Sequence, residues 1–138
     1  MEVNVFTDGA SRGNPGLAGA GSVILVNGEV VDEAFEFLGE KTNNEAEYEA
    51  LILALRRIIK LVGKRVVSVD SEYTFYADSQ LMIKQLRGEY KVKAPKVKPL
   101  YEKVCELKDE LDCKFVWVRR EDNSKADELA NRAIDERK

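Results

Sequence analysis

Residues 22–47 read SVILVNGEVVDEAFEFLGEKTNNEAE and decide how the chain folds. The apolar run from Ser22 to Val26 is followed by Asn27-Gly28, the strongest short signal for a β-hairpin, so residues 29–38 are expected to form the returning strand. Thr42-Asn43-Asn44-Glu45 then has the pattern of a capping box, which satisfies the free N–H groups at the start of a helix. The stretch therefore predicts a hairpin that leads directly into a long helix.

The flanking segments complete a β-β-β-α-β-α-α-β-α order. Residues 2–8 are short and rich in Val and Phe and predict a first strand, whereas the five glycines and the proline between Gly9 and Gly21 predict a wide loop. After the long helix, Val66 to Val69 and Tyr73 to Ala77 compete as the fourth strand, and we favour the second. The remaining predictions are a short helix from Ser79, a helix from about Lys98 to Leu111, a strand from Lys114 to Val118 and a last helix capped by Ser124.

This order predicts an α/β fold with a five-stranded mixed sheet flanked by helices. Three antiparallel strands come first, and right-handed crossovers then add two strands parallel to the first one. The carboxyl ends of the parallel strands share one edge of the sheet, where ligand sites lie in such folds. A length of 138 residues, without repeats or low-complexity tracts, predicts a single domain over residues 1–138.

The composition, with 44% hydrophobic and 34% charged residues, is typical of a soluble globular protein. No apolar run approaches the roughly 20 residues that a membrane-spanning helix needs. The first residues also lack the basic and then apolar pattern of a signal peptide. We expect a cytoplasmic monomer that has no membrane partner.

The chain contains no histidine and two cysteines, Cys105 and Cys113. The lack of histidine excludes Ser-His and Cys-His nucleophile schemes and the usual zinc sites. The two cysteines match no metal or redox spacing, so we expect reduced thiols in the core. Any catalysis must therefore use carboxylates, lysines or tyrosines.

Four carboxylates are expected to meet at one edge of the sheet. Asp8 ends the first strand and Asp78 ends the fourth, while Glu47 and Asp127 lie in first helical turns with apolar residues along the same helical face. Each acid alone has a simpler explanation, because helix dipoles favour acids in first turns and aspartates often cap turns. Four acids that meet would repel one another, so their meeting favours a metal site over four separate caps and turns. Oxygen ligands without a soft donor suit Mg²⁺ or Mn²⁺.

Four motifs, in order from residue 3 to about residue 134, together resemble type 1 ribonuclease H. They are TDGASRGNPG at 7–16, TNNEAE at 42–47, ADSQ at 77–80 and ADELA at 126–130. The first is highly specific, the second is specific in its spacing, and the last two are weak alone. The resemblance implies a ribonuclease H-like fold and an endonuclease that hydrolyses the RNA strand of RNA/DNA hybrids, leaving 5′-phosphate and 3′-hydroxyl ends.

The resemblance also implies catalysis with two Mg²⁺ ions, for which Mn²⁺ is an alternative. Asp8 would bridge both ions, with Glu47 and Asp78 on one side and Asp127 on the other. One ion would lower the pKa of the attacking water, and the other would stabilise the departing 3′ oxygen. The motif Asp70-Ser71-Glu72 imitates the Asp78 motif, but the apolar strand before Asp78 favours Asp78.

Substrate contacts follow from the same resemblance. Contacts with 2′-hydroxyls in the minor groove distinguish RNA from DNA, and Thr42 is placed for a phosphate of the DNA strand. Loop geometry is the simpler reading for Asn14 and the glycines, and helix capping is the simpler reading for Asn43 and Asn44. The residues expected along the minor groove are Gly9, Ser11, Asn14, Asn43, Asn44 and Gln80.

Two features depart from the family. The loop after the last strand lacks the histidine of many members, so Arg119 or Arg120 is expected to engage a phosphate there; a solvated charge run is the simpler reading. The segment from Lys84 to Lys103 carries a net charge of +5 in a chain of net charge −3. Within it, a short basic strip replaces the longer basic handle of some members and would hold the DNA strand, unless it is only a solvated loop. The residues of this strip are Lys91, Lys93 and Lys96.

Three alternatives remain open at this stage. The same chemistry could extend to double-stranded RNA, because the loop after the last strand lacks the family's histidine and does not decide between the two substrates. A catalytically weak hybrid-binding module is disfavoured, because pure binding would favour replacement of the acids. A transposase or resolvase domain shares the sheet and the acids but normally brings further domains.

Overall fold

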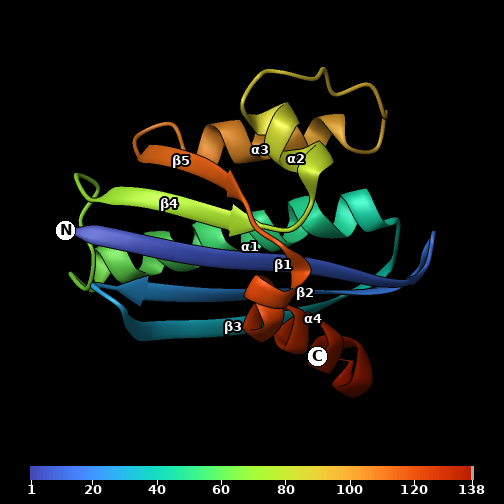
Figure 1. Ribbon diagram of the computed structural model, residues 1–138, viewed down its shortest axis with the longest axis horizontal. Helices are drawn as coiled ribbons and strands as arrows, with labels where there is room; N and C mark the ends of the chain where they lie inside the picture. The colour runs from blue at the N-terminus through green and yellow to red at the C-terminus, as the bar shows by residue number, and fades with distance from the viewer. Residues whose placement is uncertain (138) are drawn as a thin grey trace.

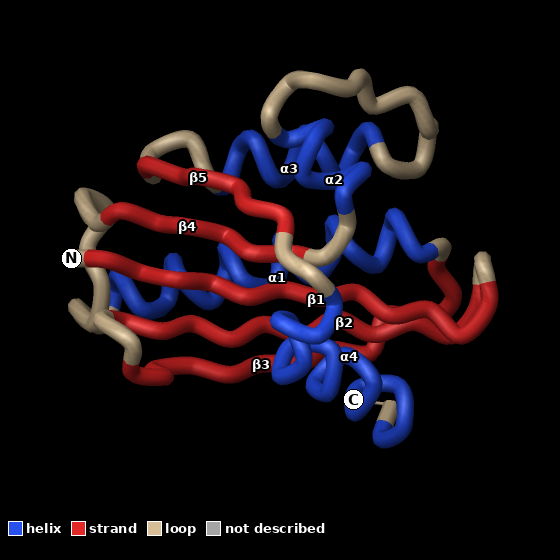
Figure 2. Tube along the Cα trace, in the orientation of Figure 1, coloured by secondary structure: helices blue, strands red, loops and turns tan. Residues whose placement is uncertain are grey.

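Five strands form one mixed sheet in the order β3-β2-β1-β4-β5 (Figures 1 and 2). The computed structural model describes residues 1–137. Neighbouring strands among the first three are antiparallel, and β4 and β5 run parallel to β1, so the predicted mixed sheet is confirmed. The strands are β1 (Glu2–Gly13), β2 (Gly16–Val26), β3 (Glu29–Lys41), β4 (Glu72–Ala77) and β5 (Asp112–Trp117).

Helices cover both faces of this sheet. α1 crosses one face with α3 packed beside it, and α4 lies across β2 on the other face (Figure 1). Among residues 1–137, no helix combines the length and the apolar character needed to cross a bilayer. The helices are α1 (Asn43–Gly63), α2 (Gln80–Leu86), α3 (Lys98–Leu107) and α4 (Ser124–Glu136), with a 3₁₀ turn η1 (Arg120–Asn123) before α4.

The capping box at the start of α1 is present as predicted. The Thr42 hydroxyl accepts a hydrogen bond from the Glu45 amide at 3.2 Å, and the Glu45 carboxylate accepts one from the Thr42 amide at 2.9 Å. These reciprocal bonds fix the first turn of α1, two residues before Glu47. The capping box therefore places Glu47 at a defined position at the edge of the sheet.

The wide loop predicted between Gly9 and Gly21 is wrong. β1 and β2 are paired up to Gly13 and Gly16, and the glycines serve close packing instead. A Cβ atom built on Gly9 would lie 2.2 Å from the carbonyl carbon of Ala46 in α1. Cβ atoms on Gly19 and Gly21 would lie 2.3 and 2.4 Å from carbonyl oxygens of α4. Glycine content indicated a loop, but here it lets helices approach both faces of the sheet.

Other boundaries also differ from the prediction. The choice of β4 is confirmed, but α3 ends at Leu107 rather than Leu111, and the returning strand β3 continues to Lys41. Ser124 does not cap α4, because η1 places Asn123 at the cap position. The Asn123 amide donates to the Thr7 carbonyl at 2.9 Å, so it ties the start of α4 to β1.

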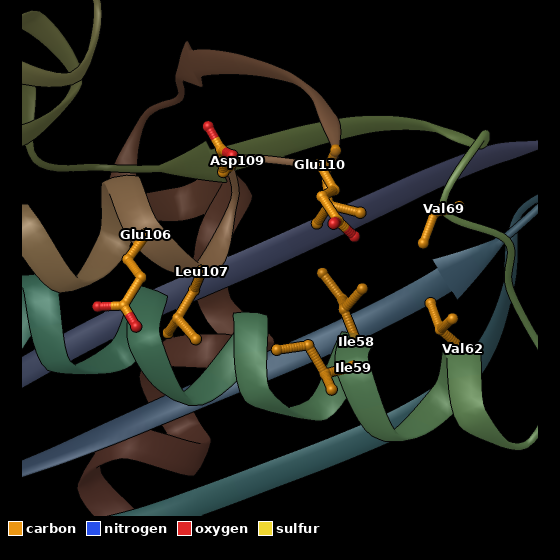
Figure 3. A pocket seen from close by; sticks show the side chains of 9 residues that line it. Ile58, Ile59, Val62, Val69, Glu106, Leu107, Asp109 and Glu110 are labelled. Carbon is orange, nitrogen blue, oxygen red and sulfur yellow. The ribbon is translucent and has the colours of Figure 1, made fainter.

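An apolar hollow of about 400 Å³ lies between α1 and the turn that leads into β5 (Figure 3). Ile58 and Val62 of α1 form its floor, and Val69 and Leu111 precede the starts of β4 and β5. This hollow is therefore at the opposite end of the parallel strands from Asp78.

The close approach of α4 to β2 predicts that Gly21→Ala destabilises the protein. The added methyl group would meet the Ala126 carbonyl oxygen at 2.4 Å, and overpacking of this kind costs about 1–3 kcal/mol. Urea unfolding measures the loss. Gly63→Ala is the control, because a Cβ there meets nothing within 4 Å. Equal stability of the two variants would contradict the packing described here.

Candidate active site

Three carboxylates converge at the carboxyl ends of β1 and β4. One oxygen from each of Asp8, Glu47 and Asp78 lies within 4.8 Å of the others. Asp8 and Glu47 are buried, with 4% and 8% of their surface exposed. The strand ends and the first turn of α1 thus bring together three of the four acids that the sequence indicated.

β1 is no longer paired with β4 at this point, and Glu47 of α1 occupies the free edge of the strand. The ladder between β1 and β4 ends at the pair Phe6 and Tyr76, which leaves the amide of Gly9 without a strand partner on that side. That amide donates to the Glu47 carboxylate at 2.7 Å. A side chain at position 9 would collide with the backbone of α1, so glycine is required for Glu47 to come this close.

Asp78 is fixed by contacts between the ends of β4 and β5. The indole N–H of Trp117 donates to the Asp78 carbonyl at 3.2 Å, and the Val118 amide donates to the Ala77 carbonyl at 3.0 Å. Trp117 was not identified from the sequence, although it is the single tryptophan and lies two residues before Arg119. Asp70, which imitates the motif, is exposed in the turn before β4 and lies outside the cluster.

Asp127 lies beside this cluster on α4. It lines the same cleft, of about 570 Å³, but is not one of the three acids whose oxygens lie within 4.8 Å. Its side chain is 31% exposed and lies 3.9 Å from the Arg120 guanidinium. The Asn131 amide donates to its carboxylate at 3.3 Å. Asp127 therefore lies in the same cleft as the other acids, and it is more exposed than Asp8 and Glu47.

Burial and repulsion raise the pKa values of the inner acids. Burial raises the pKa of Asp8 to about 10, and the neighbouring charges of Glu47 and Asp78 add to the rise. Burial also raises the pKa of Glu47, and Asp78 raises it further, while the hydrogen bond from Gly9 acts in the opposite direction. The ionised cluster is therefore electrostatically unfavourable without a cation.

The donor set fits a hard divalent cation. Within residues 1–137, none of the ion pairs involves Asp8, Glu47 or Asp78, so no basic side chain neutralises them. Carboxylate oxygens without a sulfur or imidazole donor are the ligands that Mg²⁺ and Mn²⁺ prefer. The three carboxylates of Asp8, Glu47 and Asp78 can hold such ions in the open cleft beside Gly9.

Some of the residues expected to contact substrate line the acidic cleft. Gly9, Ser11 and Asn43 do so together with Arg120. The Ser11 hydroxyl lies within hydrogen-bond distance of the carbonyls of Gly13 and Lys41, and its single proton can be donated to either. Four further lining residues were not among the predicted site residues: Ala10, Arg12, Trp117 and Asn131. Ala10 and Arg12 lie within the motif at 7–16 but were assigned no role, and Trp117 and Asn131 belong to none of the four motifs.

The other expected contacts lie outside this cleft. The Asn14 side chain accepts from the Asn43 amide at 3.0 Å, so it caps α1 from the β1–β2 turn. Gln80 is exposed at the start of α2. Thr42, Asn44 and Lys96 line a second hollow, of about 370 Å³. Lys91 and Lys93 line a third hollow beside Tyr90, and Arg119 is exposed ahead of η1.

A mixed sheet of this topology with a carboxylate cleft at the carboxyl ends of its parallel strands defines the class of ribonuclease H-like nucleases. The family described as reverse transcriptase-like matches residues 6–133. Ribonuclease H of Hydrogenovibrio crunogenus is 34% identical over 99% of this chain and 97% of its own length. The chain belongs to the type 1 ribonuclease H family.

A solved structure and a longer protein are also similar to this chain. The crystal structure of LC11-RNase H1 in complex with an RNA/DNA hybrid is similar at a TM-score of 0.90 and 43% identity, covering 98% of both chains. A bifunctional protein of Mycobacterium tuberculosis is 38% identical over 98% of this chain. The chain spans only 36% of the length of that relative.

The raised pKa of Asp8 predicts the pH dependence of stability. The unfolded carboxyl ionises near its ordinary pKa of 3.8, whereas the folded one keeps its proton up to about pH 10, so stability present below pH 3.8 is lost as the pH rises towards 10. Asp8→Asn should therefore gain stability over the parent chain between pH 4 and 8, by at least about 1 kcal/mol at pH 7 without divalent ions. Thermal unfolding across this pH range measures the difference.

Asp70→Asn is the control for this prediction, because Asp70 is an exposed aspartate outside the cluster. Its stability should follow that of the parent chain at each pH. If Asp8→Asn also follows the parent chain at each pH, the acids do not repel one another as described.

Proposed function

We propose that this chain is an endonuclease that hydrolyses the RNA strand of RNA/DNA hybrids with two divalent cations, Mg²⁺ or alternatively Mn²⁺. The observation that carries the proposal is the uncompensated cluster of Asp8, Glu47 and Asp78 with Asp127 beside it in one cleft. Membership of the ribonuclease H family supports it. The hybrid bound by LC11-RNase H1, which is 43% identical to this chain, indicates the class of substrate.

The carboxylates would divide the work of holding the ions. Asp8, between the other acids, would ligate both; Glu47 and Asp78 would complete one site, and Asp127 the other. Bound cations would activate the attacking water and neutralise charge on the leaving 3′ oxygen. The Gly9 amide and the Trp117 indole keep Glu47 and Asp78 in place while the RNA phosphate enters, and the products would carry 5′-phosphate and 3′-hydroxyl ends.

The polar rim of the cleft would read the hybrid. Donors and acceptors there can bind 2′-hydroxyls, which are absent from DNA. The side-chain oxygen of Asn44 is buried without a hydrogen-bond partner among residues 1–137, and Asn44 lines a hollow together with Thr42 and Lys96. The residues we propose for substrate contact are Gly9, Ser11, Asn14, Thr42, Asn43, Asn44, Gln80, Arg119, Arg120, Lys91, Lys93 and Lys96.

A hybrid-binding module without turnover fits the site less well. Buried acids that repel each other also repel phosphates, so a protein that only bound nucleic acid would gain affinity by replacing them. Retention of Asp8 and Glu47 in buried positions therefore favours catalysis. Cleavage of double-stranded RNA uses the same chemistry and is decided by the assay below.

The first test incubates labelled RNA/DNA hybrid, RNA duplex and DNA duplex with Mg²⁺, Mn²⁺ or EDTA. We expect cleavage of the RNA strand of the hybrid with either cation and none with EDTA. Asp78→Asn should lower the rate by about a thousandfold or more, because metal catalysis contributes several kcal/mol to the barrier. Asp70→Asn, with the same change outside the cluster, should retain the parent rate. Hybrid cleavage in EDTA would refute the proposal.

Arg120 and Arg119 provide a second test. Arg120 lines the cleft and Arg119 does not, although both are exposed. If Arg120 engages a phosphate of the substrate, Arg120→Ala should lower the cleavage rate by about tenfold, the effect of one charged contact of roughly 1.4 kcal/mol. Arg119→Ala serves as the matched variant and should change the rate less. Equal rates for Arg120→Ala and the parent chain would exclude this role.

A further inference from the structure

The face of β1 that carries Asp8 also carries Arg12. Residues an even number apart in a strand point to the same side, and this side faces α4. The Arg12 guanidinium lies 2.7 Å from the Asp135 carboxylate. The same nitrogen lies 3.4 Å from the Asn131 side-chain oxygen and 3.5 Å from the Asn131 carbonyl oxygen. The tip of β1 is therefore attached to α4 through three polar contacts.

The partners of Arg12 lie on the same stripe of α4 as Asp127. Asp127, Asn131 and Asp135 are spaced by four residues, which places them along one side of a helix. The Asn131 amide donates to the Asp127 carboxylate at 3.3 Å and to the Asp127 carbonyl at 3.0 Å. Asn131 thus connects Arg12 to the one carboxylate that lies outside the inner cluster.

Asp127 is less constrained by packing than the buried acids Asp8 and Glu47. Glu47 is buried and held by the Gly9 amide. Asp127 is 31% exposed, and its ion-pair partner Arg120 is 3.9 Å away with a side chain that is 79% exposed. Asn131 is closer to the Asp127 carboxylate than Arg120 is, at 3.3 Å, and the Asn131 side-chain oxygen is engaged by Arg12.

We infer that Arg12 and Asn131 are positioning residues for Asp127. Arg12 fixes Asn131 and the rotation of α4 against β1, and Asn131 holds the Asp127 carboxylate in the cleft, where it would ligate a second divalent cation. This inference rests on the proposed function, because it concerns the cations of the same site. Loss of a group that orients a ligand typically weakens metal binding or activity about 10–100-fold.

The test compares Arg12→Ala, Asn131→Ala and the control Arg132→Ala in three measurements. Arg132 lies next to Asn131 on α4 and pairs with Glu136 away from the cleft. The measurements are Mn²⁺ affinity by calorimetry, hybrid affinity in EDTA, and kcat as a function of Mn²⁺ concentration. We expect Asn131→Ala and Arg12→Ala to weaken Mn²⁺ binding or raise the Mn²⁺ requirement about tenfold, with unchanged hybrid affinity in EDTA. Arg132→Ala should match the parent chain.

A double-mutant cycle shows whether the effect passes through Asp127. Asn131→Ala should add less than a twofold loss in kcat to the Asp127→Asn variant, because the carboxylate it positions is already absent. Full additivity would overturn the inference, and so would Mn²⁺ affinity and kcat that both equal those of the parent chain. A loss of hybrid affinity in EDTA for Arg12→Ala would instead assign Arg12 to a phosphate of the substrate and would also overturn it.

A parent chain that fails to cleave hybrids would refute the proposed function, whereas the calorimetric comparison would still test the role of Asn131.

Discussion

The mutual repulsion of buried carboxylates is the constraint on which the site depends. Asp8 and Glu47 are buried, no basic side chain among residues 1–137 pairs with them, and their pKa values are raised. A fold can keep such a cluster only if the surrounding structure prevents the acids from moving apart. Here two helices are pressed against glycines on opposite faces of the sheet, and the ends of β4 and β5 are joined at Asp78. Bound cations would turn this repulsion into attraction.

The sequence predicted the order of elements and the meeting of the acids for clear physical reasons. The Asn27-Gly28 turn and the capping box at Thr42 are local signals, and both are present in the structure. Asp78 was chosen over Asp70 because an apolar strand precedes it. In the structure Asp78 lies in the acidic cluster and Asp70 does not. Local turn chemistry together with parallel-strand topology was therefore enough to bring three of the acids together.

Features that depend on contacts between distant segments could not be predicted. The glycines of β1 and β2 looked like a loop, because sequence alone does not show that α4 packs against Gly19 and Gly21. Trp117 and Asn131 carry no motif, and their roles arise only when β5 and α4 reach the cleft. The cap at Asn123 was missed because its amide bonds to β1 rather than to its own helix.

The most direct test of the central claim is the anomalous diffraction of Mn²⁺ in crystals of the protein with an RNA/DNA hybrid. We expect two Mn²⁺ peaks about 3.5–4 Å apart, both ligated by Asp8, as in two-metal sites. Glu47 and Asp78 should ligate one ion, and Asp127 the other. Mn²⁺ bound away from Asp8, or a hybrid seated in the cleft without Mn²⁺ at these acids, would contradict the account.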